Sequence, residues 1–171
     1  MMKKLIWLGS FLILAACGFQ PVHQAELKGG QSAYPNITIR NLDGKTPDDQ
    51  RVSFEIRQAL LDRINTHSNR GEYILEFNPI LRQIRIGITG EAIASRFDLR
   101  LTTHYSIIEG KTGDILYNDS IKSRTSFAAP LDPYSRIQTE NSAIDRLAKD
   151  AADDLILALS KFYANPPKRD E

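Results

Sequence analysis

One stretch decides the fold of this chain, Arg96–Ile107, with the sequence RFDLRLTTHYSI. Its odd-numbered positions are mostly apolar or aromatic, whereas its even-numbered positions carry charged, hydroxyl or imidazole side chains. Because successive side chains point to opposite faces of a strand, the pattern predicts a long strand with one covered and one open face. The covered face is expected to carry Phe97, Leu99, Leu101, Thr103, Tyr105 and Ile107.

A hairpin is expected directly after this strand. Glu109–Gly113 contains two glycines and suits a loop, and Ile115–Phe127 suits the returning strand. Centring the hairpin on Lys111 gives a provisional register, which can slip by two residues. It pairs Tyr105 with Tyr117 and Leu101 with Ile121 on the covered face, and Asp98 with Arg124 and Arg100 with Lys122 on the open face.

Two more strands are predicted upstream. Asn36–Leu42 alternates apolar and polar residues, and a further strand opens with Tyr73–Phe77. The apolar positions of this second strand are odd-numbered up to Phe77 but even-numbered from Ile84 onwards. That change of phase predicts a bulge or break near Asn78-Pro79, where a sheet tolerates proline.

Two helices complete the pattern. Thr46-Pro47 and Asp132-Pro133 each combine an N-capping side chain with a proline at the first helical position. The first helix is expected to end near Asn65, and its apolar stripe consists of Val52, Ile56, Ala59, Leu60 and Ile64. The stripe of the long last helix consists of Ile144, Leu147, Ala151, Leu155, Ala158, Leu159 and Phe162.

The element order is therefore β-α-β-β-β-α. A four-stranded sheet, mixed or antiparallel, with both helices on one face would bury both stripes and leave the polar sheet face open. We predict an α+β fold of two layers, formed by a single domain over residues 36–164, with residues 165–171 as a disordered tail.

The N-terminus has the pattern of a bacterial lipoprotein. Lys3 and Lys4 precede a short apolar run that ends in Leu14-Ala15-Ala16-Cys17. Residues 1–16 are expected to be a signal peptide, and Cys17 is expected to receive a diacylglycerol and an N-terminal acyl chain. The alternative is an ordinary signal peptide with a chance cysteine, although Cys17 is the only cysteine in the chain. Residues 17–35 are then a tether to the membrane.

Composition and motifs give little sign of chemistry. The chain has 22 basic and 21 acidic residues, so bulk binding of nucleic acid is not expected. His23, His67 and His104 are widely separated, which argues against a metal site. No nucleophile-elbow or zinc-protease motif is present. We therefore expect no catalytic residues, no metal and no cofactor apart from the acyl chains on Cys17.

A basic cluster on the open sheet face is the main candidate site. Arg96, Arg100, Lys122 and Arg124 are expected to lie there, with Arg85 alongside them on the preceding strand. Such a cluster suits an anion, because guanidinium groups bind phosphate through two hydrogen bonds. The alternative is a solvated face whose charges only prevent edge-to-edge aggregation.

Several motifs resemble the lipopolysaccharide-assembly lipoprotein family, LptE. The resemblance begins at the lipobox with LAACGFQPV, residues 14–22, and continues along nearly the whole chain. It includes the strand Asn36–Leu42, the first helix, the Tyr73-Ile74-Leu75 strand, the strand start Ser95–Leu99 and the helix entry Pro130–Tyr134.

This resemblance implies a non-catalytic outer-membrane lipoprotein. Members of the family sit as a plug inside the barrel LptD, expected here at one-to-one, and contact lipopolysaccharide themselves. The lipid-contacting residues of the family are not transferred to this chain, so the basic cluster rests on its own charge pattern. A rival is a free-standing periplasmic binding module for envelope polymers or a small ligand, and a cell-wall enzyme is a more distant alternative.

Overall fold

The computed structural model describes residues 37–42, 44–64, 71–88 and 94–165. These residues belong to one compact unit, Tyr34–Glu171. The expected signal peptide, Cys17, the tether and residues 166–171 of the expected tail lie outside the described residues, so these four expectations remain predictions.

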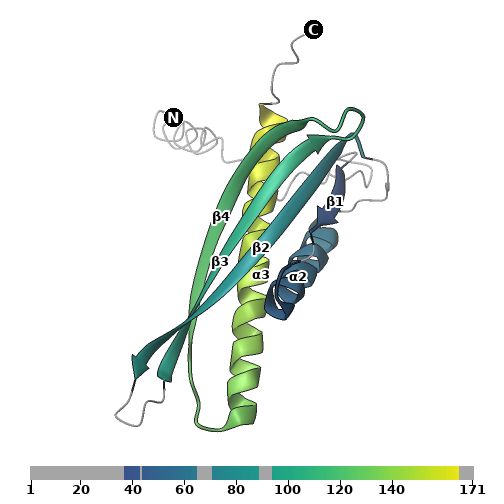
Figure 1. Cartoon of the computed structure of the whole chain (residues 1–171). Coiled ribbons are helices and arrows are strands. Elements are labelled where there is room, and N and C mark those ends of the chain that lie inside the picture. The colour runs from purple at the N-terminus through teal and green to yellow at the C-terminus, as the bar shows by residue number, and fades with distance from the viewer. Residues whose placement is uncertain (1–36, 43, 65–70, 89–93, 166–171) are drawn as a thin grey trace, which may run out of the picture. The chain divides into compact units, whose positions relative to one another are not determined.

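The order of the elements is the one predicted (Figure 1). In chain order they are β1 (Ile37–Asn41), α2 (Pro47–Arg63), β2 (Tyr73–Ile88), β3 (Ala94–Glu109), β4 (Ile115–Ala128) and α3 (Pro133–Ala164). The four strands form one sheet in the order β1-β2-β3-β4. Strand β1 is parallel to β2, and the other neighbours are antiparallel, so the sheet is mixed and the predicted α+β class is confirmed.

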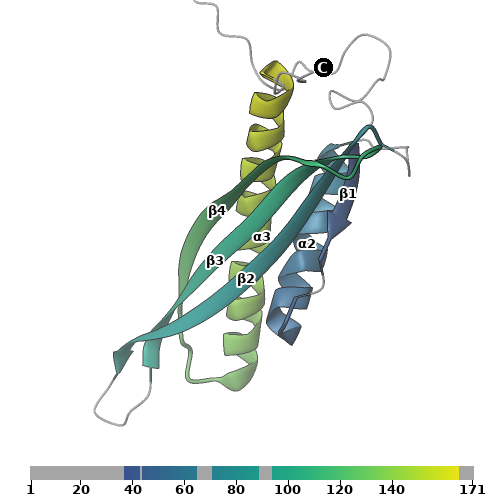
Figure 2. The same ribbon diagram turned by 45° about the horizontal axis from the view of Figure 1, so that its top comes forward.

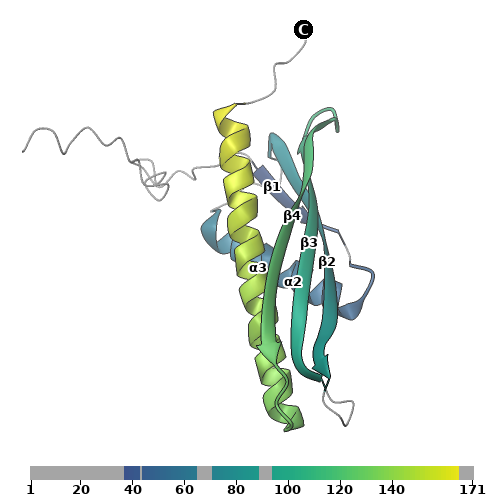
Figure 3. The same cartoon turned by 90° about the vertical axis from the view of Figure 1, so that its left-hand side faces the viewer.

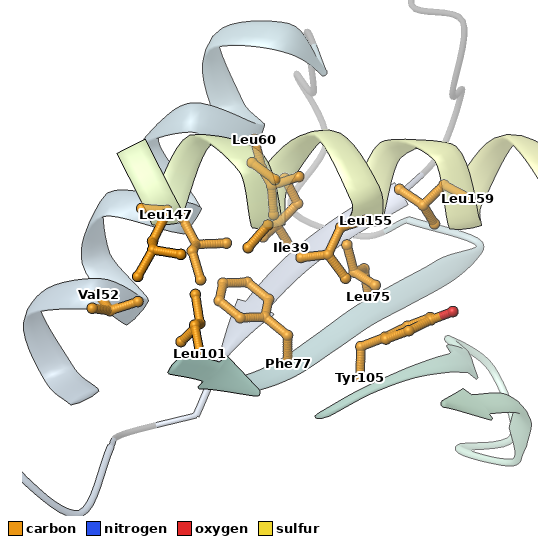
Figure 4. Packing of buried hydrophobic residues seen from close by; sticks show 14 of the residues in the cluster. Ile39, Val52, Leu60, Leu75, Phe77, Leu101, Tyr105, Leu147, Leu155 and Leu159 are labelled. Atoms are coloured by element: carbon orange, nitrogen blue, oxygen red, sulfur yellow. The ribbon is translucent and has the colours of Figure 1, made fainter. Parts of the chain in front are cut away.

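Both helices pack on one face of the sheet, which we call the covered face. In the view of Figure 2 the strands lie in front of both helices, and Figure 3 shows α3 alongside the long strands. The covered face of β3 carries the predicted odd-numbered residues, and Leu101 and Phe77 meet Leu147 and Leu155 of α3 in the core (Figure 4). Burial of these side chains stabilises the two layers by about 25 cal/mol per Å² of apolar surface.

The helix starts follow the predicted capping chemistry. The Thr46 hydroxyl accepts a hydrogen bond from the Asp49 N–H at 3.1 Å, and the Asp49 carboxylate accepts one from the Thr46 N–H at 3.2 Å. At α3 the Asp132 carboxylate accepts a hydrogen bond from the Ser135 N–H at 2.7 Å. These bonds satisfy backbone donors that have no partner inside a helix.

The predicted register of the β3–β4 hairpin is wrong by two residues. Tyr105 lies opposite Asp119, and Arg100 lies opposite Arg124. One residue of the difference comes from the loop, because Glu109 pairs with Asp114 through a 2.9 Å bond and the loop holds four residues. The other comes from a bulge, since Ile107 pairs with Tyr117 and Ile108 with Ile115, which leaves Leu116 as the extra residue.

The predicted break at Asn78-Pro79 is also wrong. Strand β2 pairs with β3 in one continuous register from Tyr73 to Ile86. The Phe77 carbonyl and the Leu81 N–H both point to the edge on the β1 side, where they bond to Leu42 and Asp49. Pro79 lies between them and faces the same edge just past β1, so its missing N–H costs no ladder bond.

Candidate functional site

The side of the sheet opposite the helices, which we call the open face, carries most of the predicted basic cluster. Even-numbered residues of β2 and β3, and of β4 from the bulge onwards, form this face, because their odd-numbered neighbours point to the helix side. The strand register arranges these side chains in rows of three, one from each strand.

One row consists entirely of arginines. Arg82, Arg100 and Arg124 lie directly opposite one another on β2, β3 and β4, and we call them the arginine row. Like charges placed directly opposite across strands destabilise a sheet slightly. The row is therefore not explained by folding stability.

One acid partly balances the row. The Asp98 carboxylate, one row further along β3, accepts a hydrogen bond from the Arg124 guanidinium across the diagonal. The Asp98 side chain is only 3% exposed, whereas that of Arg124 is 62% exposed. The pair fixes Arg124 while most of its side chain stays open to solvent.

The other cations of this face have no acidic partner. Within the described parts of the chain, Arg82, Arg96, Arg100 and Lys122 form no ion pair with any carboxylate. Lys122 lies opposite Thr102, one row from the arginine row, and Arg96 lies between Ile86 and Ala128. The open face therefore presents unpaired positive charge.

Apolar side chains lie next to the arginines on the same face. Ile84 and Ile86 follow Arg82 on β2 and are 37% and 38% exposed. The apolar positions of β2 thus do change from odd to even numbers, as the sequence indicates, but the backbone register does not change. Instead, the apolar side of β2 changes from the covered face to the open face, which no helix covers.

The structure brings four of the five predicted basic residues to the open face. Arg96, Arg100, Lys122 and Arg124 lie there, but Arg85 does not. Arg85 is opposite Phe97 and lines a hollow on the helix side together with Gln83, Arg136 and Glu140. Its placement on the open face followed from the wrong phase of β2. The same error hid Arg82, which an uninterrupted alternation would have identified.

Within the described residues, the structure shows neither a candidate metal site nor a helix that could span a membrane. His104 is exposed on the open face, while His23 and His67 lie outside the described residues. Among the residues that the structure describes, no group of three or more His, Cys, Asp or Glu side chains is placed to hold a metal. In the same part of the chain, no helix is long and apolar enough to cross a membrane.

The model of the LptE family, which is described as lipopolysaccharide-assembly, matches residues 34–159 of this chain. The chain belongs to the LptE family. No curated protein matches the chain in sequence.

Solved structures share the LptE-like fold at low identity. A putative lipoprotein from Caulobacter crescentus has a TM-score of 0.61 and 19% identity, over 77% of this chain and 93% of that one. The rare lipoprotein B from Shewanella oneidensis has a TM-score of 0.54 and 13% identity, over 75% and 96%. A lipoprotein B from Nitrosomonas europaea has a TM-score of 0.56 and 12% identity, over 86% and 94%. These likenesses show the fold alone.

Proposed function

We propose that this LptE-family chain is a non-catalytic outer-membrane lipoprotein that partners the LptD barrel and holds lipopolysaccharide on its open face. The family match supports a role in lipopolysaccharide assembly. The observation that carries the lipid-binding part is the arginine row beside two exposed isoleucines on a face that no helix covers.

The chemistry of the open face suits an anionic amphiphile. Lipopolysaccharide carries phosphates on its sugars and acyl chains beside them, so it needs cations and apolar surface close together. Guanidinium groups bind phosphate through charge-assisted hydrogen bonds, which are about twice as strong as neutral ones. Ile84 and Ile86 would gain by removing their exposed apolar surface from water against an acyl chain.

The membrane and barrel parts of the proposal rest on the leader and on surface polarity. Multiple acyl chains on Cys17 would hold the chain stably at a membrane, where a single chain binds only marginally. Large outer-membrane barrels have polar lumens, and the mixed-charge, polar surface of this domain suits such an environment.

Charge removal on the arginine row tests the lipid-binding part. The variant Arg82→Gln/Arg100→Gln should bind lipopolysaccharide at least about tenfold more weakly, since each lost charge-assisted bond contributes about 1.5–3 kcal/mol. The matched control is Arg85→Gln/Arg136→Gln, which removes the same charge from the helix side. Equal affinities for the two variants, both folded by circular dichroism, would reject the site.

Extraction of the tagged protein from its own outer membrane tests the barrel part. The proposal predicts that one large β-barrel protein co-purifies at one-to-one. A monomer that brings down no barrel, from a membrane where the barrel is present, would overturn this part.

A groove between β4 and α3 favours the rival binding module. It has a volume of about 420 Å³, and its lining includes apolar residues such as Leu116, Ile121 and Leu157. Small-ligand sites are concave and mostly apolar with a few polar groups, and this groove meets that description in part. A monomer from the extraction experiment would put this free-standing module, with its ligand in the groove, ahead of the barrel partner.

A further inference from the structure

A second feature of the open face lies nearer to β1 than the arginine row. It is a shallow hollow of about 510 Å³ between the end of β1 and the middle of β4. Two rows of the sheet form its floor, one with Asn78, His104 and Ser120 and the other with Glu76, Ser106 and Asn118. We call this feature the polar hollow.

The side chains of the polar hollow offer hydrogen bonds that the protein leaves unused. Two amides, two hydroxyls and one imidazole belong to residues with no side-chain hydrogen bond to any described residue. They are Asn78, Asn118, Ser106, Ser120 and His104. Amides and hydroxyls both donate and accept, so these groups can serve a ligand that does the same.

The charges around the polar hollow are already partnered. Glu76 pairs with Arg40 at 3.3 Å. The Asp119 carboxylate accepts hydrogen bonds from the Tyr117 hydroxyl at 3.2 Å and from the Ser120 N–H at 2.7 Å. Among the described residues that line the hollow there is no arginine or lysine, and the neighbouring Arg40 is paired with Glu76. The described lining therefore offers no free arginine or lysine to a phosphate.

An apolar ligand does not suit the polar hollow either. Among the described lining residues, only Leu42 has an exposed apolar side chain, because the Phe77 and Tyr105 side chains are buried on the covered face. A neutral polyhydroxyl ligand fits best, since each hydroxyl donates and accepts hydrogen bonds and needs no charge.

The order of features along the open face names the ligand more closely. Arg82 lies four residues after Asn78 on β2, which is about 14 Å along a strand. Ile84 and Ile86 follow on the far side of the arginine row. Along β2 the open face thus runs from Asn78 through Arg82 to Ile84 and Ile86, the order of sugar, phosphate and acyl chain in one lipopolysaccharide molecule. Arg96 of β3 is a further cation beside Ile86.

We propose that the polar hollow is a saccharide site, which binds a neutral sugar of the lipopolysaccharide whose phosphates lie on the arginine row. This inference rests on the proposed function. It adds that the chain recognises the saccharide itself, at a place distinct from the phosphate contacts.

The first test compares two ligands on the full chain in detergent. The variant Asn78→Ala/Asn118→Ala should bind lipopolysaccharide about five- to tenfold more weakly and lipid A, which lacks the outer sugars, with unchanged affinity. The control Gln83→Ala/Gln138→Ala removes two exposed amides elsewhere and should bind both ligands as the unaltered chain does. An unchanged affinity for lipopolysaccharide, or an equal loss for both ligands, would overturn the saccharide site.

A second test does not depend on the arginine row. A dephosphorylated core oligosaccharide without acyl chains, titrated into the isotope-labelled full chain, should shift the side-chain amide signals of Asn78 and Asn118. The signals of Gln83 and Gln138 should stay in place. No shift at millimolar oligosaccharide would overturn the inference, whether or not the chain binds lipid A. If the full chain binds the oligosaccharide but not lipid A, the result contradicts the proposed function and leaves this site standing.

Discussion

The β2–β3 pair is packed differently in its two halves. In the near half, residues 73–81 of β2 and 99–109 of β3, the covered face holds core residues such as Leu75, Phe77 and Leu101. In the far half, which we call the arm, β2 residues 82–87 are exposed on both faces. Figure 1 shows β2 and β3 continuing into this arm away from α3.

The difference separates folding from function. The register with β3 is continuous through both halves, so the ladder bonds carry on while helix packing stops. The near half gains most of its stability from the core, whereas β2 in the arm presents Arg82, Ile84 and Ile86 to solvent. We therefore expect substitutions in the near half to affect stability and substitutions in the arm to affect binding.

The largest effect is expected in the near half. Phe77→Ala removes a fully buried ring and should lower the free energy of unfolding by about 3–5 kcal/mol. Ile84→Ala, on the same strand but in the arm, should change it by about 0.5 kcal/mol at most. Urea denaturation followed by circular dichroism measures both, and similar losses for the two variants would contradict the comparison.

The next effect is expected where the two halves meet. The buried Asp49 carboxylate accepts the Leu81 N–H at 2.7 Å and also caps α2. Asp49→Ala leaves these backbone donors unpaired and should lower the free energy of unfolding by about 2 kcal/mol. The control Asp48→Ala alters an exposed neighbour in the same turn, and an equal urea midpoint for the two variants would contradict this role of Asp49.

A binding effect without a stability effect is expected in the arm. Ile84→Ser/Ile86→Ser should weaken lipopolysaccharide binding about tenfold, because less apolar surface is then buried against the ligand. Its urea midpoint should stay close to that of the unaltered chain. The control Ile115→Ser changes an isoleucine that is also exposed but lies at the other end of the sheet, next to the hairpin loop. It should bind normally.

The smallest effect is expected outside both halves, at the start of α3. Hydrogen bonds from Ser135 lower the pKa of Asp132. The ionised carboxylate then stabilises the fold above its unfolded-state pKa of about 3.9, and this stabilisation is lost as the pH falls through the lower folded-state pKa. The urea midpoint of Asp132→Asn should fall slightly less steeply with decreasing pH than that of the unaltered chain. An unchanged acid limb would contradict the role of this cap.

The sequence predicts most of the fold because the decisive signals are local. Thr46-Pro47 and Asp132-Pro133 mark both helix starts through capping chemistry within four residues. The register of β3 with β4 depends on a loop length and on one bulged residue, Leu116, which leave no periodic signal. Two of the predicted pairs are in contact as diagonal neighbours and not as directly opposed residues. They are the Asp98–Arg124 ion pair and the Tyr105–Tyr117 rings, whose centroids are 6.0 Å apart.

The site was predicted in part, and its errors have one physical cause. Arg96, Arg100, Lys122 and Arg124 follow from the alternation of strands covered on one face. The sequence pattern places Arg85 on the open face in place of Arg82, because apolar positions are normally assumed to mark the covered face. In the arm that assumption fails, since Ile84 and Ile86 lie on the open face.

The central claim, that the open face of the arm holds lipopolysaccharide, is tested most directly by photocrosslinking along β2. A photoreactive residue is placed in turn at positions 83, 84, 85 and 86 of the full chain in its own membrane, and lipopolysaccharide adducts are detected. The account predicts adducts from positions 84 and 86 on the open face and none from positions 83 and 85. Adducts from 83 and 85 instead, or equally from all four positions, would contradict it.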